Sequence, residues 1–291
     1  MALLSLIEKV DNSPYTTDPA VFLFRAHDGT LLGKVVPSVA EHLRTVGWLT
    51  VQNQEVRIND SEQLDAKFAN LTASWRQQKL FKVLEGWRSE LYSCYLKGGQ
   101  KYFSIERSAA CLFGLVTYGC HITGYSGTPD KIWVPQRSFD KPTFPGMLDN
   151  TVAGGLGDNL GFWECAVKEC YEEAGLAREY VERRLKPTGA LTYEFIDPST
   201  GYYQPEVECV YDLAMDPDTV PKPVDGEAQN FRLMSVDEVK VRMLKGQFKY
   251  NCALVLVDYF IRHGMIQVDD EPDYFEIVSR SHRNLEYPLR K

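Results

Sequence analysis

The 291-residue sequence has no long apolar stretch and no surplus of basic residues. Its apolar runs, such as Ala253 to Val257, fall far short of the ~20 residues that a membrane-spanning helix requires. Asp and Glu number 40 against 32 Lys and Arg, so the net charge is −8. We therefore expect no transmembrane helix, no membrane partner and no electrostatic binding of nucleic acid.

The sequence also lacks the cysteine and histidine spacings of common metal sites. The seven cysteines are odd in number and include no C-x-x-C pair, which argues against a zinc site and a disulfide framework. The five histidines show no H-E-x-x-H spacing. No basic residues precede the short apolar run at the amino-terminal end, unlike in a secretory or transit signal. We expect reduced, buried thiols and a cytoplasmic protein.

The composition that remains is that of a globular chain, with 44% hydrophobic and 25% charged residues. A single domain typically spans about 100–200 residues, so we expect two domains. The pattern of apolar residues changes after 97–100. We predict a small α+β domain at 1–105, a second domain at 106–267 and an extended tail at 268–291.

The first domain begins with a predicted β-hairpin. Two apolar runs, 20–26 and 30–35, flank Asp28-Gly29, a dipeptide typical of tight turns between paired strands. A helix capped by Ser61 is then predicted from helically spaced apolar residues. These residues are Leu64, Phe68, Leu71 and Trp75.

The second domain combines predicted strands and helices, which favours a mixed sheet with helices packed on it. A Pro-rich loop is predicted at 140–146, and Ser235 and Asn251 are predicted to cap two later helices. Strands are expected at 111–125, 131–137, 191–196 and 207–214, and a helix at 163–174.

The helix at 163–174 carries the residues that point to chemistry. Glu169, Glu172 and Glu173 fall within an arc of roughly 100° on the helix. We predict that this arc faces outward, and that another side packs on the sheet through apolar residues. Those apolar residues are Trp163, Ala166, Val167, Cys170 and Ala174. The glycines before the helix permit close backbone approach to a ligand, and carboxylate oxygens suit Mg²⁺ or Mn²⁺.

The stretch from Gly154 to Leu176 resembles the Nudix box, G-x5-E-x7-R-E-U-x-E-E-x-G-U, in which U is apolar. Two positions depart from the box. Leu160 stands in place of its first Glu, and Lys168 in place of Arg. Lysine keeps the charge and can pair with Glu164 or Glu172, but it lacks the planar fork of arginine. The residues in register are Gly154, Glu169, Cys170, Glu172, Glu173, Gly175 and Leu176.

Segments outside the box resemble one branch of the Nudix hydrolases. This branch occurs alone or as the N-terminal half of some fungal thiamine pyrophosphokinases. The resemblance implies an α/β/α sandwich with a mixed sheet, preceded by the small α+β domain. It also implies hydrolysis of thiamine diphosphate and, preferentially, of its damaged oxo and oxy analogues to a monophosphate and phosphate, which is metabolite damage control. The segments are 86–92, 113–125, 133–138, 141–155, 224–227 and 251–264.

The resemblance assigns Glu169, Glu172 and Glu173 as ligands of Mg²⁺ or Mn²⁺, with the Gly154 carbonyl as a further ligand. One of these glutamates, or Glu227 outside the box, would deprotonate the attacking water. A carboxylate in an ordinary turn is the alternative for Glu227.

Four further residues are candidates for substrate binding. Arg137 and Lys141 would hold diphosphate oxygens, with simple surface solvation as the alternative. Trp87 and Arg88 would line a pocket in which an aromatic ring stacks on a cationic heterocycle. For Trp87, packing in a core at the domain junction is equally compatible with the sequence.

Other functions share the same box. A nucleotide such as ADP-ribose or a nucleoside diphosphate is an alternative substrate among small organic diphosphates. A weakly active ligand-binding module is a second alternative, because Leu160 replaces an acid of the box. We expect a monomer or a homodimer.

Overall fold

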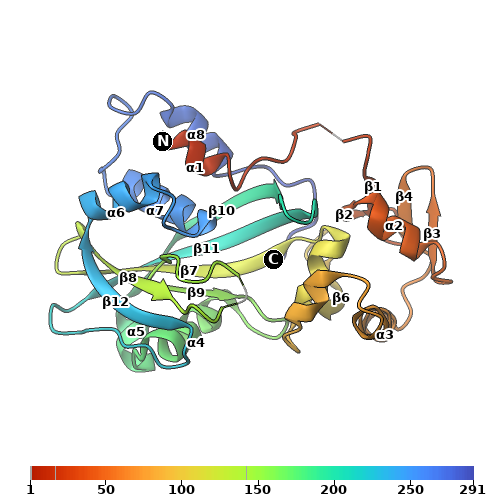
Figure 1. Ribbon diagram of the computed structural model, residues 1–291, viewed down its shortest axis with the longest axis horizontal. Coiled ribbons are helices and arrows are strands. Elements are labelled where there is room, and N and C mark those ends of the chain that lie inside the picture. The colour runs from red at the N-terminus through yellow and green to blue at the C-terminus, as the bar shows by residue number, and fades with distance from the viewer. Residues whose placement is uncertain (1, 17, 142) are drawn as a thin grey trace.

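The computed structural model describes residues 2–16, 18–141 and 143–291, and its strands form two separate regions (Figure 1). The predicted Pro-rich loop includes Pro142, which lies outside the described residues.

The N-terminal region contains a four-stranded sheet with the strand order β2-β1-β4-β3. Its strands are β1 Phe22–Arg25, β2 Leu31–Val35, β3 Leu49–Gln52 and β4 Glu55–Ile58. A second sheet pairs β5 Leu91–Tyr95 with β6 Lys101–Glu106. The helices of this region are α2 Pro37–Leu43, α3 Leu64–Gln77 and the 3-10 helices η1 Lys82–Gly86 and η2 Arg107–Phe113.

The predicted hairpin is confirmed, whereas the predicted cap of α3 is wrong. Strands β1 and β2 are antiparallel, and the Thr30 backbone N–H donates to Asp28 Oδ1 at 2.9 Å. Helix α3 follows Gln63, which has φ 51° and makes no side-chain cap. A capping side chain must directly precede the helix to reach its free N–H groups, and Ser61 lies too far upstream.

The second region is a mixed six-stranded sheet with the order β10-β11-β7-β8-β12, to which β9 adds beside β7. The β7–β11 pair is parallel, and the other pairs are antiparallel. The first strands are β7 Thr117–Ser126, β8 Lys131–Arg137 and β9 Val152–Gly155. The later strands are β10 Leu185–Ile196, β11 Tyr203–Met215 and β12 Ala228–Ser235.

Helices cover both faces of this sheet, so the expected α/β/α sandwich is confirmed (Figure 1). On one face lie α4 Phe162–Ala174 and α5 Arg178–Arg184. On the other lie α6 Val236–Leu244 and α7 Tyr250–Arg262, with α1 Leu4–Ile7 and α8 Tyr274–Arg280 packed beside them. Each face has its own apolar core, one around α7 and one around α4.

Two local predictions in this region are wrong. Residues 111–116 are not strand, because η2 and a left-handed Gly114 precede β7. Short apolar runs do not distinguish a strand from a buried helical turn. Asn251 does not cap α7 but lies in its first turn, where its side chain donates to Glu208. Trp163 is 38% exposed, but its ring packs edge-to-face against Tyr211 of β11, so it still lies on the predicted apolar side of α4. The predicted Ser235 cap of α6 is confirmed, since its hydroxyl accepts from the Glu238 N–H.

The C-terminal segment is packed rather than extended. Helix α8 buries Ile277, and the next residues lie beside β10, where the Arg283 N–H donates to the Thr192 carbonyl at 3.0 Å. The buried Arg283 guanidinium donates to Asp11 at 2.9 Å, which joins the two ends of the chain. Across the described ranges, we find no helix with the length and apolar character needed to span a bilayer.

Candidate active site

The glycines of the box bring the backbone of β9 against α4. Strand β9 pairs with β7, so that Gly154 lies opposite Cys120. A Cβ atom at Gly154 would overlap the Glu169 side chain. Only glycine therefore allows the Glu169 carboxylate to lie directly on this strand.

Glu173 converges on the same strand from the next turn of α4. Its Oε2 accepts the Ala153 backbone N–H at 3.1 Å. Burial, followed by the charge of Asp149, raises the pKa of Glu173 well above its usual value, and burial likewise raises the pKa of Glu169. Two of the three acids, Glu169 and Glu173, thus face β9, because α4 packs with this side beside the strand, whereas the Glu172 side chain is 44% exposed, as we predicted for the arc.

The Lys168 ammonium lies between the carboxylates of Glu169 and Glu172. Its Nζ lies 2.6 Å from Glu172 Oε2 and 3.2 Å from Glu169 Oε1. The predicted pair with Glu172 therefore forms, whereas Glu164 pairs with Arg178 at 2.7 Å. No three acidic, His or Cys side chains of the described residues are grouped closely enough to hold a metal ion.

The residues along β9 nevertheless fit a magnesium-like ion. Glu169 and Glu173 present buried oxygen donors whose charges repel each other, and the backbone of Gly154 in β9 lies against the Glu169 side chain. Mg²⁺ in proteins commonly takes only one or two carboxylates, completing its shell with water and substrate phosphates. Glu169 and Glu173 suit this mode, and Glu172 would join them only if it left Lys168.

Glu227 and its partner Lys141 belong to the surroundings of Glu173, because Glu227 and Glu173 line one small cavity. Lys141 Nζ is 2.5 Å from Glu227 Oε2. Burial alone would raise the pKa of Glu227, but the Lys141 and Arg137 charges outweigh burial and lower it. A small cavity is lined by Arg137, Asp149, Glu173 and Glu227 among others. The fold therefore brings together four of the residues predicted from sequence, Arg137, Lys141, Glu173 and Glu227.

Arg137 is held by several partners. Its guanidinium donates to Asp149 at 2.6 Å and to the carbonyl oxygens of Phe144 and Thr143 at 3.1 and 3.0 Å. The side chain thereby fixes the loop that leads from β8 to β9. These contacts give Arg137 a structural role in the loop, whether or not it also binds the substrate.

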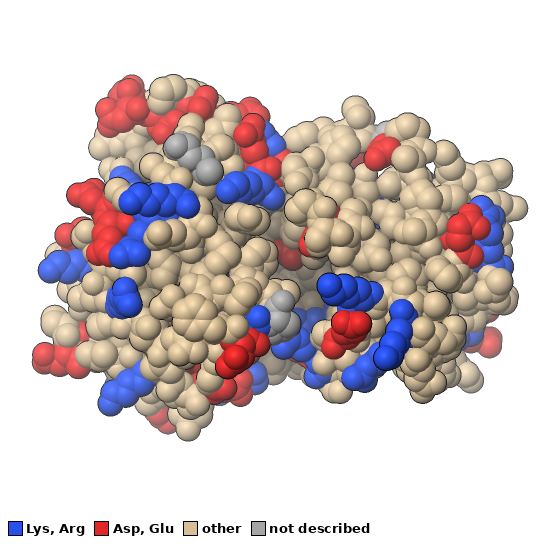
Figure 2. Space-filling view, viewed as in Figure 1, with Lys and Arg blue, Asp and Glu red and all other residues tan. Residues whose placement is uncertain are grey.

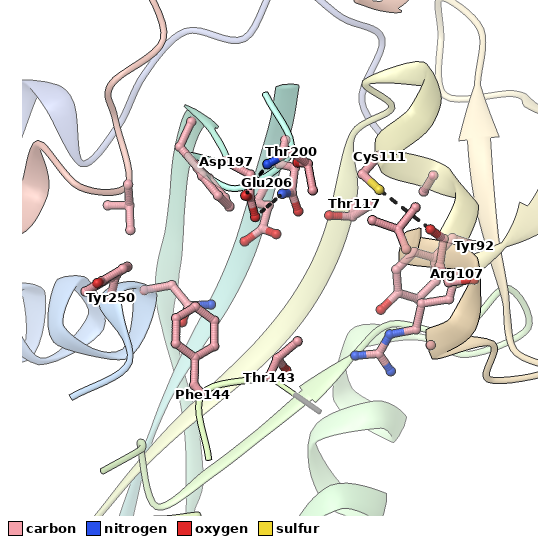
Figure 3. A pocket seen from close by; sticks show the side chains of 18 of the residues that line it. Tyr92, Arg107, Cys111, Thr117, Thr143, Phe144, Asp197, Thr200, Glu206 and Tyr250 are labelled. Atoms are coloured by element: carbon pink, nitrogen blue, oxygen red, sulfur yellow. Dashed lines mark hydrogen bonds between the residues drawn. The ribbon is translucent and has the colours of Figure 1, made fainter. Parts of the chain in front are cut away.

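A larger cavity of about 400 Å³ lies between the N-terminal region and the sheet (Figure 3). The space-filling view shows the surface hollowed between these two regions (Figure 2). Arg88 lines the cavity, whereas Trp87 packs against the N-terminal core, with the Arg76 guanidinium 4.8 Å from its ring centre. The walls come from η2, β11, the 143–144 loop and the start of α7.

Two side chains join this cavity to the box. A Cβ atom at Gly155 would overlap the Tyr92 hydroxyl and would lie 3.2 Å from Arg107 Cζ. Arg107 pairs with Glu90 at 2.7 Å, and Figure 3 shows Tyr92 and Arg107 together at one wall. Neither residue was predicted from the sequence, because both lie in another region, about 50 to 60 positions before the box.

Glu206 and Lys249 also line the cavity and were not identified from sequence. Among the described residues, the Lys249 ammonium has no ion pair within 4.0 Å. The sequence contains one weak indication of Glu206. Glu206 and Glu208 lie two residues apart, so they place two acidic side chains on the same face of an otherwise apolar strand.

Comparison with known protein families identifies both regions. The NUDIX domain family matches residues 118–253, and a domain of unknown function, DUF4743, matches residues 3–117. An uncharacterized protein of Saccharomyces cerevisiae, YJR142W, is 35% identical over 317 residues, which cover 99% of this chain and 92% of the yeast protein. The chain thus carries a NUDIX domain, preceded by the DUF4743 region. It is a hydrolase of pyrophosphate bonds, and Nudix hydrolases generally use divalent metal ions.

Plant Nudix hydrolases are similar over a shorter range. Nudix hydrolase 20, chloroplastic, of Arabidopsis thaliana is 38% identical over 202 residues, or 68% of this chain and 53% of the plant protein. This Nudix chain thus spans about half the length of that relative.

The solved structures that match this chain are more distant in sequence. The DR0079 structure from Deinococcus radiodurans has a TM-score of 0.37 and 18% identity, covering 57% of this chain and 83% of that one. The NUDIX domain of Shewanella oneidensis NrtR, complexed with ADP ribose, has a TM-score of 0.40 and 13% identity, covering 53% of this chain and 91% of that one.

Proposed function

We propose that this Nudix hydrolase cleaves the diphosphate of thiamine diphosphate and, preferentially, of its oxo and oxy analogues, giving the monophosphate and phosphate. The observation that carries this proposal is the cavity of about 400 Å³ that adjoins the box at Gly155. A substrate with its diphosphate along β9 has room for an organic group beside it. The thiamine assignment itself rests on the resemblance of segments outside the box.

The size and walls of the cavity favour a compact, electron-poor heterocycle. Its volume is near the lower limit for small-molecule pockets, about 300 to 1,000 Å³. The Phe144 and Tyr250 rings line it, 5.7 Å apart and nearly perpendicular, and offer faces to a cationic ring. Asp197 and Glu206 add carboxyl groups to the same cavity (Figure 3).

Arg107 is the cation best placed for the diphosphate. Its guanidinium lies against Gly155, where the cavity meets the box. The Glu90 pair leaves other N–H groups of the guanidinium for phosphate oxygens, which guanidinium groups bind in a bidentate manner. Arg137 and Lys141 remain candidates for the same role, although both already pair with carboxylates.

The residues of the box would hold the metal and direct a proton. Glu169, Glu173 and the Gly154 carbonyl, with Glu172, would hold Mg²⁺ or Mn²⁺, which neutralises phosphate charge and lowers the pKa of bound water. Lys168 restrains Glu169 and Glu172 on one side of α4. Because Lys141 lowers its pKa, Glu227 is ionised at neutral pH and can accept a proton from water.

A substrate panel tests the proposal. Phosphate release is measured from thiamine diphosphate, oxythiamine diphosphate, oxothiamine diphosphate, ADP-ribose and nucleoside di- and triphosphates, with and without Mg²⁺. We expect the highest kcat/KM for the thiamine analogues and none without metal. A nucleotide as the best substrate would contradict the thiamine proposal and support the nucleotide alternative.

Two variants complete this experiment. Glu173→Gln is expected to abolish turnover, whereas Glu164→Gln, on the same helix but exposed and paired with Arg178, is expected to leave it unchanged. Equal turnover in Glu173→Gln would remove the assigned metal site. Absence of turnover for every compound would favour a ligand-binding role.

A further inference from the structure

Glu206 places a carboxyl group with one free oxygen in the wall of the cavity. One of its oxygens accepts from the Tyr193 hydroxyl, and its Oε1 has no hydrogen-bond partner among the described residues. Figure 3 places Glu206 among the lining side chains, near Asp197 and Thr200. The anchored oxygen fixes the carboxyl group, so that the free oxygen can contact a bound ligand.

A buried network supports this carboxyl group from behind. The fully buried Tyr193 hydroxyl also lies 3.1 Å from Glu208 Oε1, so one hydroxyl serves two carboxyl groups. Glu208 in turn faces His121, with Oε2 and Nε2 3.4 Å apart, and accepts from Asn251 at 3.4 Å. Two carboxylates at one hydroxyl in a buried site repel each other, so one of them favours a proton.

The surroundings assign that proton to Glu206. Burial and the charge of Glu208 raise the pKa of Glu206 to about 7. Burial also disfavours ionised Glu208, but the neighbouring His121 outweighs burial and lowers the pKa of Glu208 to about 2. Near neutral pH, Glu206 is therefore present in both forms while Glu208 remains ionised.

A carboxyl group that changes form can serve two kinds of ligand. As a carboxylate it accepts a hydrogen bond from an amino group, and as a carboxylic acid it donates one to a carbonyl oxygen. Thiamine carries an amino group on its pyrimidine ring, and the oxy analogue carries an oxo group at the same position. The thiazole part and the diphosphate of these two compounds are the same.

We propose that Glu206 is the specificity residue that contacts this edge of the heterocycle, and that it accepts both the amino and the oxo form. This inference rests on the proposed function, because it assumes that the organic group enters the cavity. It explains how one pocket takes an intact cofactor and a damaged one without a change in shape.

Charged and titratable groups from several elements surround Glu206. The charge of Lys249, the residue before α7, opposes protonation of Glu206, whereas the charge of Glu208 favours it. The groups are Tyr92 on β5, Tyr193 on β10, Asp197 after β10, Glu208 on β11 and Lys249 before α7, with His121 on β7 behind Glu208. Glu206 differs from these groups because burial and the charge of Glu208 bring its pKa to about 7.

The test compares two substrates as pH changes. The ratio of kcat/KM for thiamine diphosphate to that for oxythiamine diphosphate is measured from about pH 6 to 8.5, across the titration of a carboxyl group with a pKa near 7. The shared diphosphate cancels effects of the metal site and of the catalytic base. We expect the ratio to rise with pH by up to about tenfold, the worth of one hydrogen bond of about 1.4 kcal/mol.

Three variants locate the effect. Glu206→Gln is expected to give a ratio independent of pH, because an amide both donates and accepts throughout. Asp197→Asn, which alters another carboxylate of the same cavity, is expected to keep the dependence. Tyr193→Phe removes a hydrogen bond that lowers the pKa of Glu206, so the midpoint should move to higher pH. If Glu206→Gln does not fold, the shift of the midpoint in Tyr193→Phe tests the inference in its place.

A wild-type ratio that does not change with pH, or the same dependence in Glu206→Gln, would overturn the inference. Failure of the proposed function gives a different result, namely turnover of nucleotides and not of thiamine compounds. In that case the ratio is measured with adenosine diphosphate and inosine diphosphate instead of the two thiamine compounds, because they differ by the same amino-to-oxo change. If no compound is hydrolysed, calorimetric Kd values of the thiamine pair supply the ratio.

Discussion

Lys141 and Glu227 form a 2.5 Å ion pair that connects the loop before β9 to the segment before β12. The Ser138 backbone N–H also donates to the Glu227 carbonyl at 2.8 Å, so the two segments are held together at two points. The pair keeps a carboxylate ionised beside Glu173, whose own pKa is raised. Two neighbouring acids thus have pKa values shifted in opposite directions, which suits different roles at one site.

Replacing Lys141 should move the acid limb of the pH–rate profile. A carboxylate base is active above its pKa and is lost as pH falls through that value. Lys141→Met removes the charge that lowers the pKa of Glu227, so kcat/KM should begin to fall at a higher pH than in the wild type. Lys141→Arg retains the charge and serves as the control. An unchanged acid limb in Lys141→Met would exclude Glu227 as the base.

The two glycines at the end of β9 should separate catalysis from substrate binding. In Gly154→Ala the new Cβ displaces Glu169, so kcat should fall by about 100-fold or more. In Gly155→Ala it displaces Tyr92 and Arg107, so KM should rise more than kcat falls. Gly161→Ala, where a Cβ meets no atom within 4 Å, is the control. Identical kinetic changes in both β9 variants would contradict the assigned division.

Glu173→Gln should stabilise the metal-free protein while it abolishes turnover. Burial and neighbouring acids raise the pKa of Glu173 in the folded protein. At neutral pH, which is above the pKa of this group in the unfolded chain, Glu173 therefore lowers the stability of the fold. Removing the charge should raise the free energy of unfolding by about 1 kcal/mol, as is common for functional residues. Thermal unfolding in chelator measures this change. Added Mg²⁺ should then stabilise the wild type but not the variant, and equal stabilisation of both would argue against this ligand.

Leu160→Glu tests whether the departure from the box weakens the enzyme. Leu160 packs, partly buried, against the core beneath α4, so a charged side chain should cost about 1 kcal/mol of stability. Lys168 already pairs with Glu169 and Glu172, so the cation of the box is not left without a partner when position 160 is Leu. We therefore expect kcat/KM to change by less than about tenfold, within the range of one lost or gained hydrogen bond. A larger gain in rate would show that the natural chain is a weakened enzyme.

Local sequence patterns were sufficient for elements whose determinants are neighbours in the chain. The Asp28-Gly29 hairpin, the Ser235 cap and helix α4 all depend on residues within a few positions of one another. The predictions failed where a local pattern of residues is compatible with two different structures. The apolar run before β7 is a helical turn, and the supposed tail folds as α8 against the first residues of the chain.

By itself, the sequence determined the family and the positions of Gly154, Glu169, Glu172 and Glu173, because a helical motif has fixed spacing. Only the tertiary structure decided which way these acids face and what surrounds them. Packing of the N-terminal region against the sheet brings Tyr92 and Arg107 to Gly155 and forms the cavity that Glu206 lines. Burial and ion pairing depend on such distant contacts, and they set the charge of each carboxyl group where spacing along the chain cannot.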